Sequence, residues 1–321
     1  MEDEDYIDYI LAKILVVYSR NIFIEKRSAI WDTCYEYQRK VGLNRENLEN
    51  MAGNTLVTGF FGFTDNRDMD PVIISDTLFR LAVAVGVRGL QNPEGGYHHQ
   101  PVVNSIKLTD SELLTEIEKE TGFKIHLPQF VGGKDIVRTD RGIITTRIVY
   151  YMWVLKRIME LCPARDSAII EVGAGLGILG YYLSKAGYKD YTAIDLANAN
   201  ACQAYFLARN LPEREIIFSN SAEDPLSPGY RNCLKILHVN DFEGIPKNRF
   251  AIMVNMDGMT EMNKGDAIRY IGDDCSPLLL SINHEMNDFR VIDIIYRGGK
   301  KLVYRYPFWL RDGYVEELYK K

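Results

Sequence analysis

The hydrophobic positions in the first part of the chain recur every three to four residues, as on one face of an α-helix. Two such stripes, within 7–18 and 78–85, predict amphipathic helices that pack on a core. Thr109 and Glu112 have the spacing of a capping box, and Gly122 is placed to end the helix that they begin. This part of the chain is therefore predicted to be mostly helical.

Further along, short apolar runs alternate with helical patterns. A helix predicted from Ile148 is followed by a strand at Ala168–Val172, a helix from Leu176 to Gly187 and a strand at Tyr191–Ile194. This order is a βαβ unit, which indicates a parallel sheet. The later elements expected are a helix at 198–211 and strands at 215–218, 234–239, 250–255 and 278–282.

The C-terminal part carries a hairpin signal. Arg297-Gly298-Gly299-Lys300 separates two apolar runs, 291–296 and 301–306, which we expect to pair antiparallel at the end of the sheet. The predicted fold class is α/β: a Rossmann-like doubly wound sheet with a terminal antiparallel hairpin, plus a mostly helical N-terminal region. We expect the two parts to span 1–145 and 146–321.

Composition and charge limit the kinds of partner and the cellular compartment to be expected. The 321 residues are 46% hydrophobic, which is enough to bury a large core, and a net charge of −6 argues against a nucleic-acid partner. Five scattered cysteines suit free thiols in a reducing compartment, so a cytoplasmic location is expected. The N-terminus is acidic, so no secretory signal is expected there. No run of 18 apolar residues occurs, so no membrane span is expected. The oligomeric state stays open.

A glycine-rich loop directly follows the first predicted strand of the βαβ unit. Residues 169–172 are apolar except for Glu171, and the chain then reads Gly173-Ala174-Gly175-Leu176-Gly177. Glycine lets the backbone turn tightly and approach a ligand, and the next helix offers free N–H groups. The loop therefore predicts a cofactor site.

Two cofactors compete for this loop. Gly175, Gly177 and Gly180 satisfy G-x-G-x-x-G, and Asp195 lies 20 residues past Gly175, as in a dinucleotide fingerprint. Glu171 before the glycines gives instead E-x-G-x-G-x-G, the pattern associated with S-adenosylmethionine (SAM). A carboxylate beneath the loop suits the cationic SAM and would repel a pyrophosphate. SAM is favoured, and an NAD-dependent oxidoreductase stays the alternative.

Asp195 ends the second strand of the βαβ unit, where a carboxylate can accept both ribose hydroxyls of an adenosine. The adenine edge has two candidate partners, Ser221–Asp224 and the strand end at Val239–Asp241. The full set of residues predicted to bind the cofactor is Glu171, Gly173, Ala174, Gly175, Gly177, Asp195 and Leu196.

Several pieces of the chain resemble one family. EVGAGLG, IDLANANACQAYFL, NMDGMTEM, SINHE and YPFWLRDGY, between about residues 145 and 315, are similar to segments of the sugar O-methyltransferase family of class I SAM-dependent methyltransferases. The resemblance implies methyl transfer from SAM to a hydroxyl of a sugar or glycan acceptor. Ala197 and Gly258 depart from the family pattern, which usually has proline and serine there. A SAM-binding or glycan-binding protein without turnover is a further alternative.

The catalytic candidates stand where apolar strands end, because open α/β sheets bind ligands there. Asp257 and Glu261 follow one strand, and His284 follows the next. Histidine ordinarily titrates near neutral pH, so His284 is predicted to be the general base, with Asp257 or Glu261 binding or orienting the acceptor. Glu261 as a helix-end charge and His284 as an ordinary strand-end histidine remain open. No metal site is predicted, since the carboxylates here lack a tight repeating spacing. The N-terminal region is expected to help form the acceptor pocket or its lid.

Overall fold

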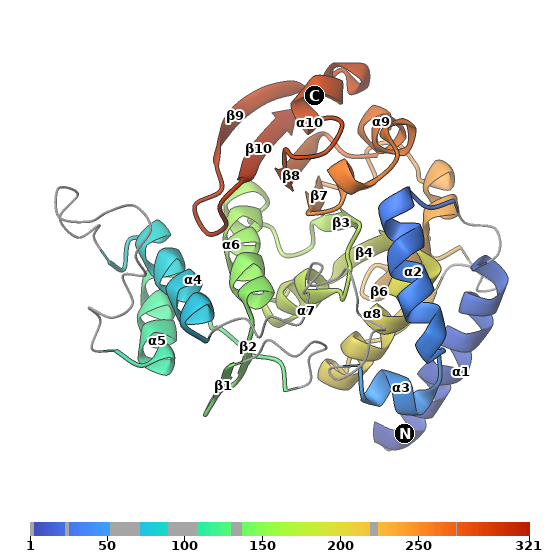
Figure 1. Cartoon of the computed structure of the whole chain (residues 1–321), viewed down its shortest axis with the longest axis horizontal. Coiled ribbons are helices and arrows are strands. Elements are labelled where there is room, and N and C mark those ends of the chain that lie inside the picture. The colour runs from blue at the N-terminus through green and yellow to red at the C-terminus, as the bar shows by residue number, and fades with distance from the viewer. Residues whose placement is uncertain are drawn as a thin grey trace.

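A computed structural model describes residues 3–22, 26–51, 71–88, 108–129, 137–218, 224–273 and 275–321 (Figure 1). Ser221, Ala222 and Glu223, three of the residues considered for the adenine edge, lie outside these ranges.

The fold is α/β, with a mostly parallel sheet of eight strands in the order β5-β6-β4-β3-β7-β8-β10-β9. β3 is the first strand of this sheet in the chain. The next strands, β4 to β6, lie on one side of β3, and β7 then pairs with β3 on the other side. The strand order reverses at β3, so the carboxyl end of β3 is the usual position for a ligand crevice. The strands are β3 Ala168–Val172, β4 Asp190–Asp195, β5 Ile216–Phe218, β6 Leu234–His238, β7 Ile252–Met256, β8 Leu278–His284, β9 Lys301–Pro307 and β10 Tyr314–Lys320.

A terminal antiparallel hairpin is present, and its strand β9 matches the predicted run 301–306, but the other predicted strand is wrong. β10 pairs antiparallel with both β8 and β9, so the hairpin consists of β9 and β10. The run 291–296 is helical instead, as α10 (Val291–Ile294) and the start of a 3-10 turn. Arg290 and Asp293 form a reciprocal cap at the start of α10, which explains why this apolar run begins a helix.

Helices cover both faces of the sheet, and strand residues alternate between two cores. On β3, Ile169 packs in the core that contains α6 (Thr146–Leu161), whereas Ile170 and Val172 pack in the core beside α9 (Lys264–Gly272). Two further helices of the sheet are α7 (Ile178–Lys185) and α8 (Ala197–Asn210). The predicted doubly wound arrangement is confirmed.

The described N-terminal region is mostly helical, as predicted. Its capping box is present: Thr109 and Glu112 cap α5, and Gly122 ends it in the left-handed conformation. α1 lies against α8, and α4 lies against α5 and α6 (Figure 1). The elements are α1 Asp3–Asn21, α2 Ala29–Val41, α3 Arg45–Glu49, α4 Pro71–Ala84, α5 Asp110–Thr121, and the short strand pair β1 Val137–Thr139 and β2 Gly142–Ile144.

The hydropathy of the helices bears on whether any of them could cross a membrane. Within the residues described, none of the helices combines the length and the apolar character that crossing a bilayer requires.

Candidate functional site

A cavity of about 290 Å³ opens at the carboxyl ends of the central strands. The loops that follow β3, β4, β6 and β7 contribute to its wall. Residues from 26–31, in the N-terminal region of the chain, also line it. It therefore lies at the reversal of the strand order, where ligands bind in folds of this kind.

The glycine loop lines this cavity. Gly173, Ala174 and Gly175 are part of the wall, and Gly173 and Gly175 have φ values of 73° and 55°. A Cβ atom on Gly175 would meet no protein atom within 4 Å, so the space beside it is open. Gly177, also predicted to bind the cofactor, does not line the cavity. It precedes α7 and faces Gln203, whose Cγ would lie 2.7 Å from a Cβ there.

Gly180 has a packing role. A Cβ on it would lie 2.5 Å from the ring of Tyr191, so only glycine lets α7 approach β4 this closely. This contact explains the last glycine of the G-x-G-x-x-G pattern without a ligand.

Asp195 and Leu196 line the cavity next to the loop. The Asp195 carboxylate accepts hydrogen bonds from the backbone N–H of Gly175 at 2.7 Å and of Leu196 at 2.8 Å. A carboxylate can accept several hydrogen bonds at once, so these two contacts are compatible with a ligand hydroxyl at Asp195. Asp195 thus holds the glycine loop in shape and also faces the space that the loop borders.

The strand end at Val239–Asp241 reaches the same cavity. Val239 and Asn240 belong to its wall, because β6 is the direct neighbour of β4. β5 lies one strand further out, at the sheet edge. For a ligand beside Asp195, the strand order therefore favours Val239–Asp241 as the nearer of the two candidate adenine partners.

Glu171 is fully buried and does not line the cavity. Its carboxyl accepts hydrogen bonds from the hydroxyls of Tyr151, at 3.0 Å, and Tyr191. Burial raises the pKa of Glu171 to about 8, although both hydrogen bonds act in the opposite direction. This carboxyl therefore has two tyrosine partners behind the loop, and its role toward a cationic cofactor stays a prediction.

We expect Glu171 to make stability depend on pH. Its raised pKa means that the folded state holds the proton more tightly, so this stabilisation is complete below about pH 4.5 and is lost as the pH rises towards 8. Glu171→Gln stays neutral at every pH. Between pH 5 and 8, the free energy of unfolding of the wild type should fall relative to this variant by on the order of 2 to 3 kcal/mol in urea titrations. Parallel pH curves would contradict the expectation, and the exposed Glu160→Gln should run parallel to the wild type.

Residues 26–31, which the sequence did not single out, form part of the cavity wall. Lys26, Arg27, Ser28 and Trp31 line it at and before the start of α2. The side chain of Asn263 donates a hydrogen bond to the backbone oxygen of Arg27 at 3.4 Å, which links this segment to the loop after β7. No motif marks these positions, so only the fold identifies them.

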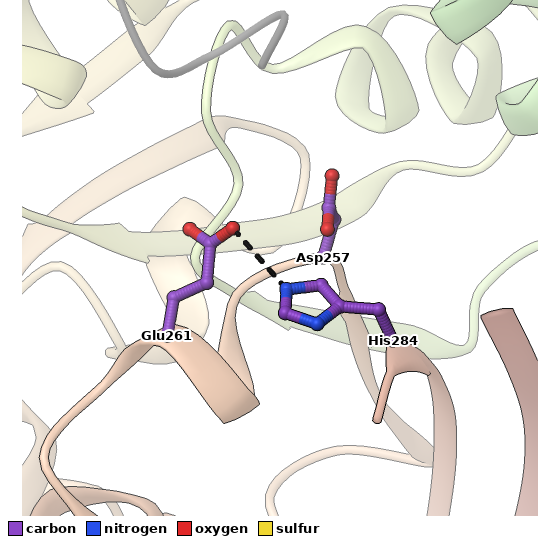
Figure 2. A group of neighbouring side chains, drawn as sticks. All are labelled: Asp257, Glu261 and His284. Atoms are coloured by element: carbon purple, nitrogen blue, oxygen red, sulfur yellow. Dashed lines mark ion pairs between the residues drawn. The ribbon is translucent and has the colours of Figure 1, made fainter. Parts of the chain in front are cut away.

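The three catalytic candidates lie together (Figure 2). Asp257 follows β7, Glu261 ends the 3-10 turn η5 (Met259–Glu261), and His284 ends β8. One ligand atom from each residue lies within 4.8 Å of those of the other two. We expected these strand ends to lie close together, and in the structure the three side chains lie side by side. Of the three, only Asp257 lines the cavity.

Two buried amides hold the turn that carries Asp257. Asn255 donates to the backbone oxygen of Val172 at 2.7 Å and accepts from the N–H of Met259 at 3.0 Å. Asn283 donates to Asn255 at 2.8 Å and accepts from the N–H of Gly258 at 3.1 Å. These bonds satisfy the amides within the protein, so the structure accounts for both as backbone caps.

Asp257 is held by strong partners. Arg147 and Arg311 pair with its carboxylate, Arg311 at 2.7 Å, and the Tyr314 hydroxyl donates to it. Burial disfavours the ionised form, but the two guanidinium charges outweigh it and lower the pKa of Asp257 to about 2. So weak a base cannot take a proton from a hydroxyl near neutral pH. Its φ of 59° also places it in the left-handed region, which aspartate tolerates better than most residues.

His284 and Glu261 form a partly buried pair. The imidazole Nε2 lies 3.7 Å from the Glu261 carboxylate, which is longer than a hydrogen bond and leaves this edge of the ring accessible. Nδ1 accepts the N–H of Met286 at 3.4 Å, and the ring packs edge-on against Tyr314 at 5.5 Å between centroids. In this arrangement the neutral ring carries its proton on Nε2, facing Glu261. A hydroxyl placed beside the pair, within reach of both side chains, would meet a carboxylate and an N–H group.

The same three residues could offer a cation one nitrogen and two oxygen ligands, but the charges around them do not favour it. Both guanidinium groups on Asp257 already neutralise its carboxylate and would repel a divalent ion. We therefore keep the prediction that no metal is needed. Treating the protein with EDTA should leave any catalytic turnover unchanged, and activity lost to EDTA and restored by Mg²⁺ would contradict this.

No family model matches the chain, and no curated protein matches it. Among solved structures it is similar to the pyocyanin biosynthetic protein PhzM, with 12% identity and a TM-score of 0.39, over 54% of this chain and 56% of that one. It thus spans little more than half of PhzM.

Two other similar structures are named as methyltransferases. One is magnesium protoporphyrin IX methyltransferase (ChlM) from Synechocystis PCC 6803 with bound SAM, with 10% identity and a TM-score of 0.38, over 55% of this chain and 80% of that one. The other is a SAM-dependent methyltransferase from Aquifex aeolicus, with 16% identity and a TM-score of 0.35, over 53% and 88%. Similarity at this level does not identify what this chain binds.

Proposed function

We propose that this protein is a SAM-dependent O-methyltransferase. The observation that carries the proposal is the cavity at the reversal of the strand order, which joins an open glycine loop and Asp195 to the turn of Asp257, beside Glu261 and His284. The first group suits an adenosyl cofactor, and the second offers a proton acceptor next to it.

Several features favour SAM over NAD. The loop carries the E-x-G-x-G-x-G pattern associated with SAM, with the Glu171 carboxyl before the glycines. Gly177, which a dinucleotide would approach, is turned toward Gln203 instead. The antiparallel strand β10 between β8 and β9 also fits the class I methyltransferase fold to which the motifs point.

Different residues of this chain have different roles in the proposed methyl transfer. When bound, SAM supplies an electrophilic methyl group. Asp195 and the backbone of Gly173 and Gly175 would hold the cofactor beside the turn of Asp257. The Glu261 carboxylate accepts the proton of the attacking hydroxyl, and the Nε2–H of His284 orients the same oxygen. Glu261 and His284 thus form the general-base pair, while Asp257 fixes the turn between them and the cofactor.

The acceptor that we propose is a hydroxyl of a sugar or glycan. Three pieces that resemble the sugar O-methyltransferase family, 255–262, 281–285 and 306–314, are far apart in the sequence. They supply Asp257 and Glu261, then His284, and finally Arg311 and Tyr314. All of these residues contact or border one cluster, which supports a shared role. Residues 26–31 of the N-terminal region would form the opposite wall of the acceptor pocket.

The test separates cofactor binding from turnover. Calorimetric titration should show binding of SAM and none of NAD⁺ at matched concentrations. Incubation with radiolabelled SAM and a panel of saccharides should then transfer label to at least one of them. Tight NAD⁺ binding would favour the oxidoreductase alternative, and SAM binding without transfer to any acceptor would favour a binding protein without turnover.

Gly175 provides a matched test of the loop. Gly175→Ala adds a methyl group to the cavity wall, so the affinity for SAM should fall about tenfold or more in a calorimetric titration. Gly187→Ala is the control, since Gly187 also has a positive φ and open space around it but does not line the cavity. Both variants should lose about 1 to 2 kcal/mol of stability from backbone strain. Equal SAM affinity in the two variants would place the cofactor elsewhere.

A further inference from the structure

A second cavity, of about 420 Å³, lies away from the first, between the segment after α5 and the ends of α7 and α8. Its wall contains five basic side chains from four parts of the chain, and no carboxylate is among the described residues that line it. The basic residues are Lys124, His126, Arg141, Lys185 and Arg209.

Three of these side chains have carboxylate partners behind the wall. Arg141 pairs with Glu118, Lys185 pairs with Glu213 at 3.1 Å, and Arg209 lies 3.8 Å from Glu4. Glu213 and Glu4 are largely exposed, so solvent screens their charges. Among the described residues, no ion pair involves Lys124 or His126. The cavity therefore has an excess of positive charge.

The pKa of His126 responds to this excess of positive charge. Burial and the charges of Lys124 and Lys185 hold the pKa of His126 below its usual range, and Arg141 acts in the same direction. Glu118 is the charge that opposes them. The nearby cations thus disfavour the charged form of the imidazole, and a bound anion would let it accept a proton.

We propose that this second cavity binds the phosphate group of a small organic phosphate. A phosphate dianion has enough oxygens to accept hydrogen bonds from several cations at once, which the wall offers from different directions. The Asn210 side chain, whose oxygen accepts the N–H of Gln129 at 3.1 Å, braces one side of the wall. The volume exceeds that of a single phosphate, which leaves room for an organic part. This site is independent of methyl transfer.

The test follows the imidazole proton of His126 by NMR, assigned with a His126→Gln variant. Inorganic phosphate, glucose 6-phosphate and ADP are titrated separately into the full-length protein at constant ionic strength, with chloride as the reference. We expect a saturable rise in the pKa of His126 of about half a unit or more with at least one phosphate ligand. A preference among the three ligands would identify the organic part.

The variant Lys124→Gln/Lys185→Gln should abolish this saturable response, and its melting temperature reports whether it is folded. The control Lys119→Gln/Lys189→Gln removes the same charge at positions outside the cavity and should respond like the wild type. A response of equal size in both double variants, or one that never saturates, would show charge screening alone and overturn the proposal. If the first double variant fails to fold, Lys124→Gln alone should weaken phosphate binding at least threefold, and unchanged binding would overturn the proposal.

Discussion

Replacing Glu261 with glutamine should lower the turnover number by about 10²- to 10⁴-fold, because it removes the proton acceptor of the proposed general-base pair. Glutamine keeps much of the volume but cannot exchange a proton. The affinity for SAM should stay nearly unchanged, since neither His284 nor Glu261 lines the cofactor cavity. Steady-state assays with labelled SAM and calorimetry measure the two quantities separately. The acidic limb that a base gives to the pH–rate profile should disappear.

The double variant His284→Gln/Glu261→Gln shows whether the two residues act as one unit. If they do, it should be about as slow as the slower single variant, because a pair that works together is lost with either member. Multiplied losses would instead show two independent roles. Glu285→Gln is the matched control: it follows His284 but pairs with Arg305 at 2.7 Å, so its turnover should stay within a few-fold of the wild type. Wild-type turnover in Glu261→Gln would exclude the pair as the base.

The sheet could be predicted where its signals are local. The apolar strands β3 and β7 and the glycines after β3 are continuous in the sequence, so periodicity and turn chemistry locate them within a few residues. The glycine loop needs no distant partner to be recognised. Its neighbour Asp195 follows from a fixed spacing along the same βαβ unit.

β10 could not be predicted in this way, because buried positions on both of its faces carry charge. Glu316 and Glu317 are almost completely buried in the middle of this strand, where an apolar pattern would be expected. Their partners come from other elements: Arg157 and Trp153 on α6 bind Glu316, and Arg305 on β9 binds Glu317. A buried carboxylate with such partners is compatible with a strand, but no local pattern shows the partners.

The same limit applies to the candidate site. The sequence placed Asp257, Glu261 and His284 at neighbouring strand ends, yet their different roles depend on non-local contacts. The guanidinium groups of Arg147 and Arg311 make Asp257 a fixed anion, and no spacing rule connects them to it. Likewise, Glu171 stands in a recognisable motif, but its two tyrosine partners lie on α6 and β4.

Asp257→Asn should cost about 3 to 5 kcal/mol of stability, which is typical of breaking a buried ion pair. The variant leaves Arg147, which is only 8% exposed, without its carboxylate. Asparagine tolerates the left-handed backbone at this position, so strain contributes little to the loss. Urea unfolding at pH 7 measures it. Asp266→Asn removes one partner of a half-buried pair, 3.9 Å from Arg269 on the wall of the same cavity, and should change stability by less than about 0.5 kcal/mol.

The pH dependence and a second substitution identify the cause. Because the pKa of Asp257 is lowered to about 2, its stabilisation is complete above about pH 4 and is lost as the pH falls towards 2. The wild type and Asp257→Asn should therefore differ most at neutral pH and converge in acid. Arg147→Met in the Asp257→Asn background should recover part of the lost stability, since it removes the unpaired buried charge. A loss below about 1 kcal/mol in Asp257→Asn, or no recovery in the double variant, would mean that water and not Asp257 balances the Arg147 charge.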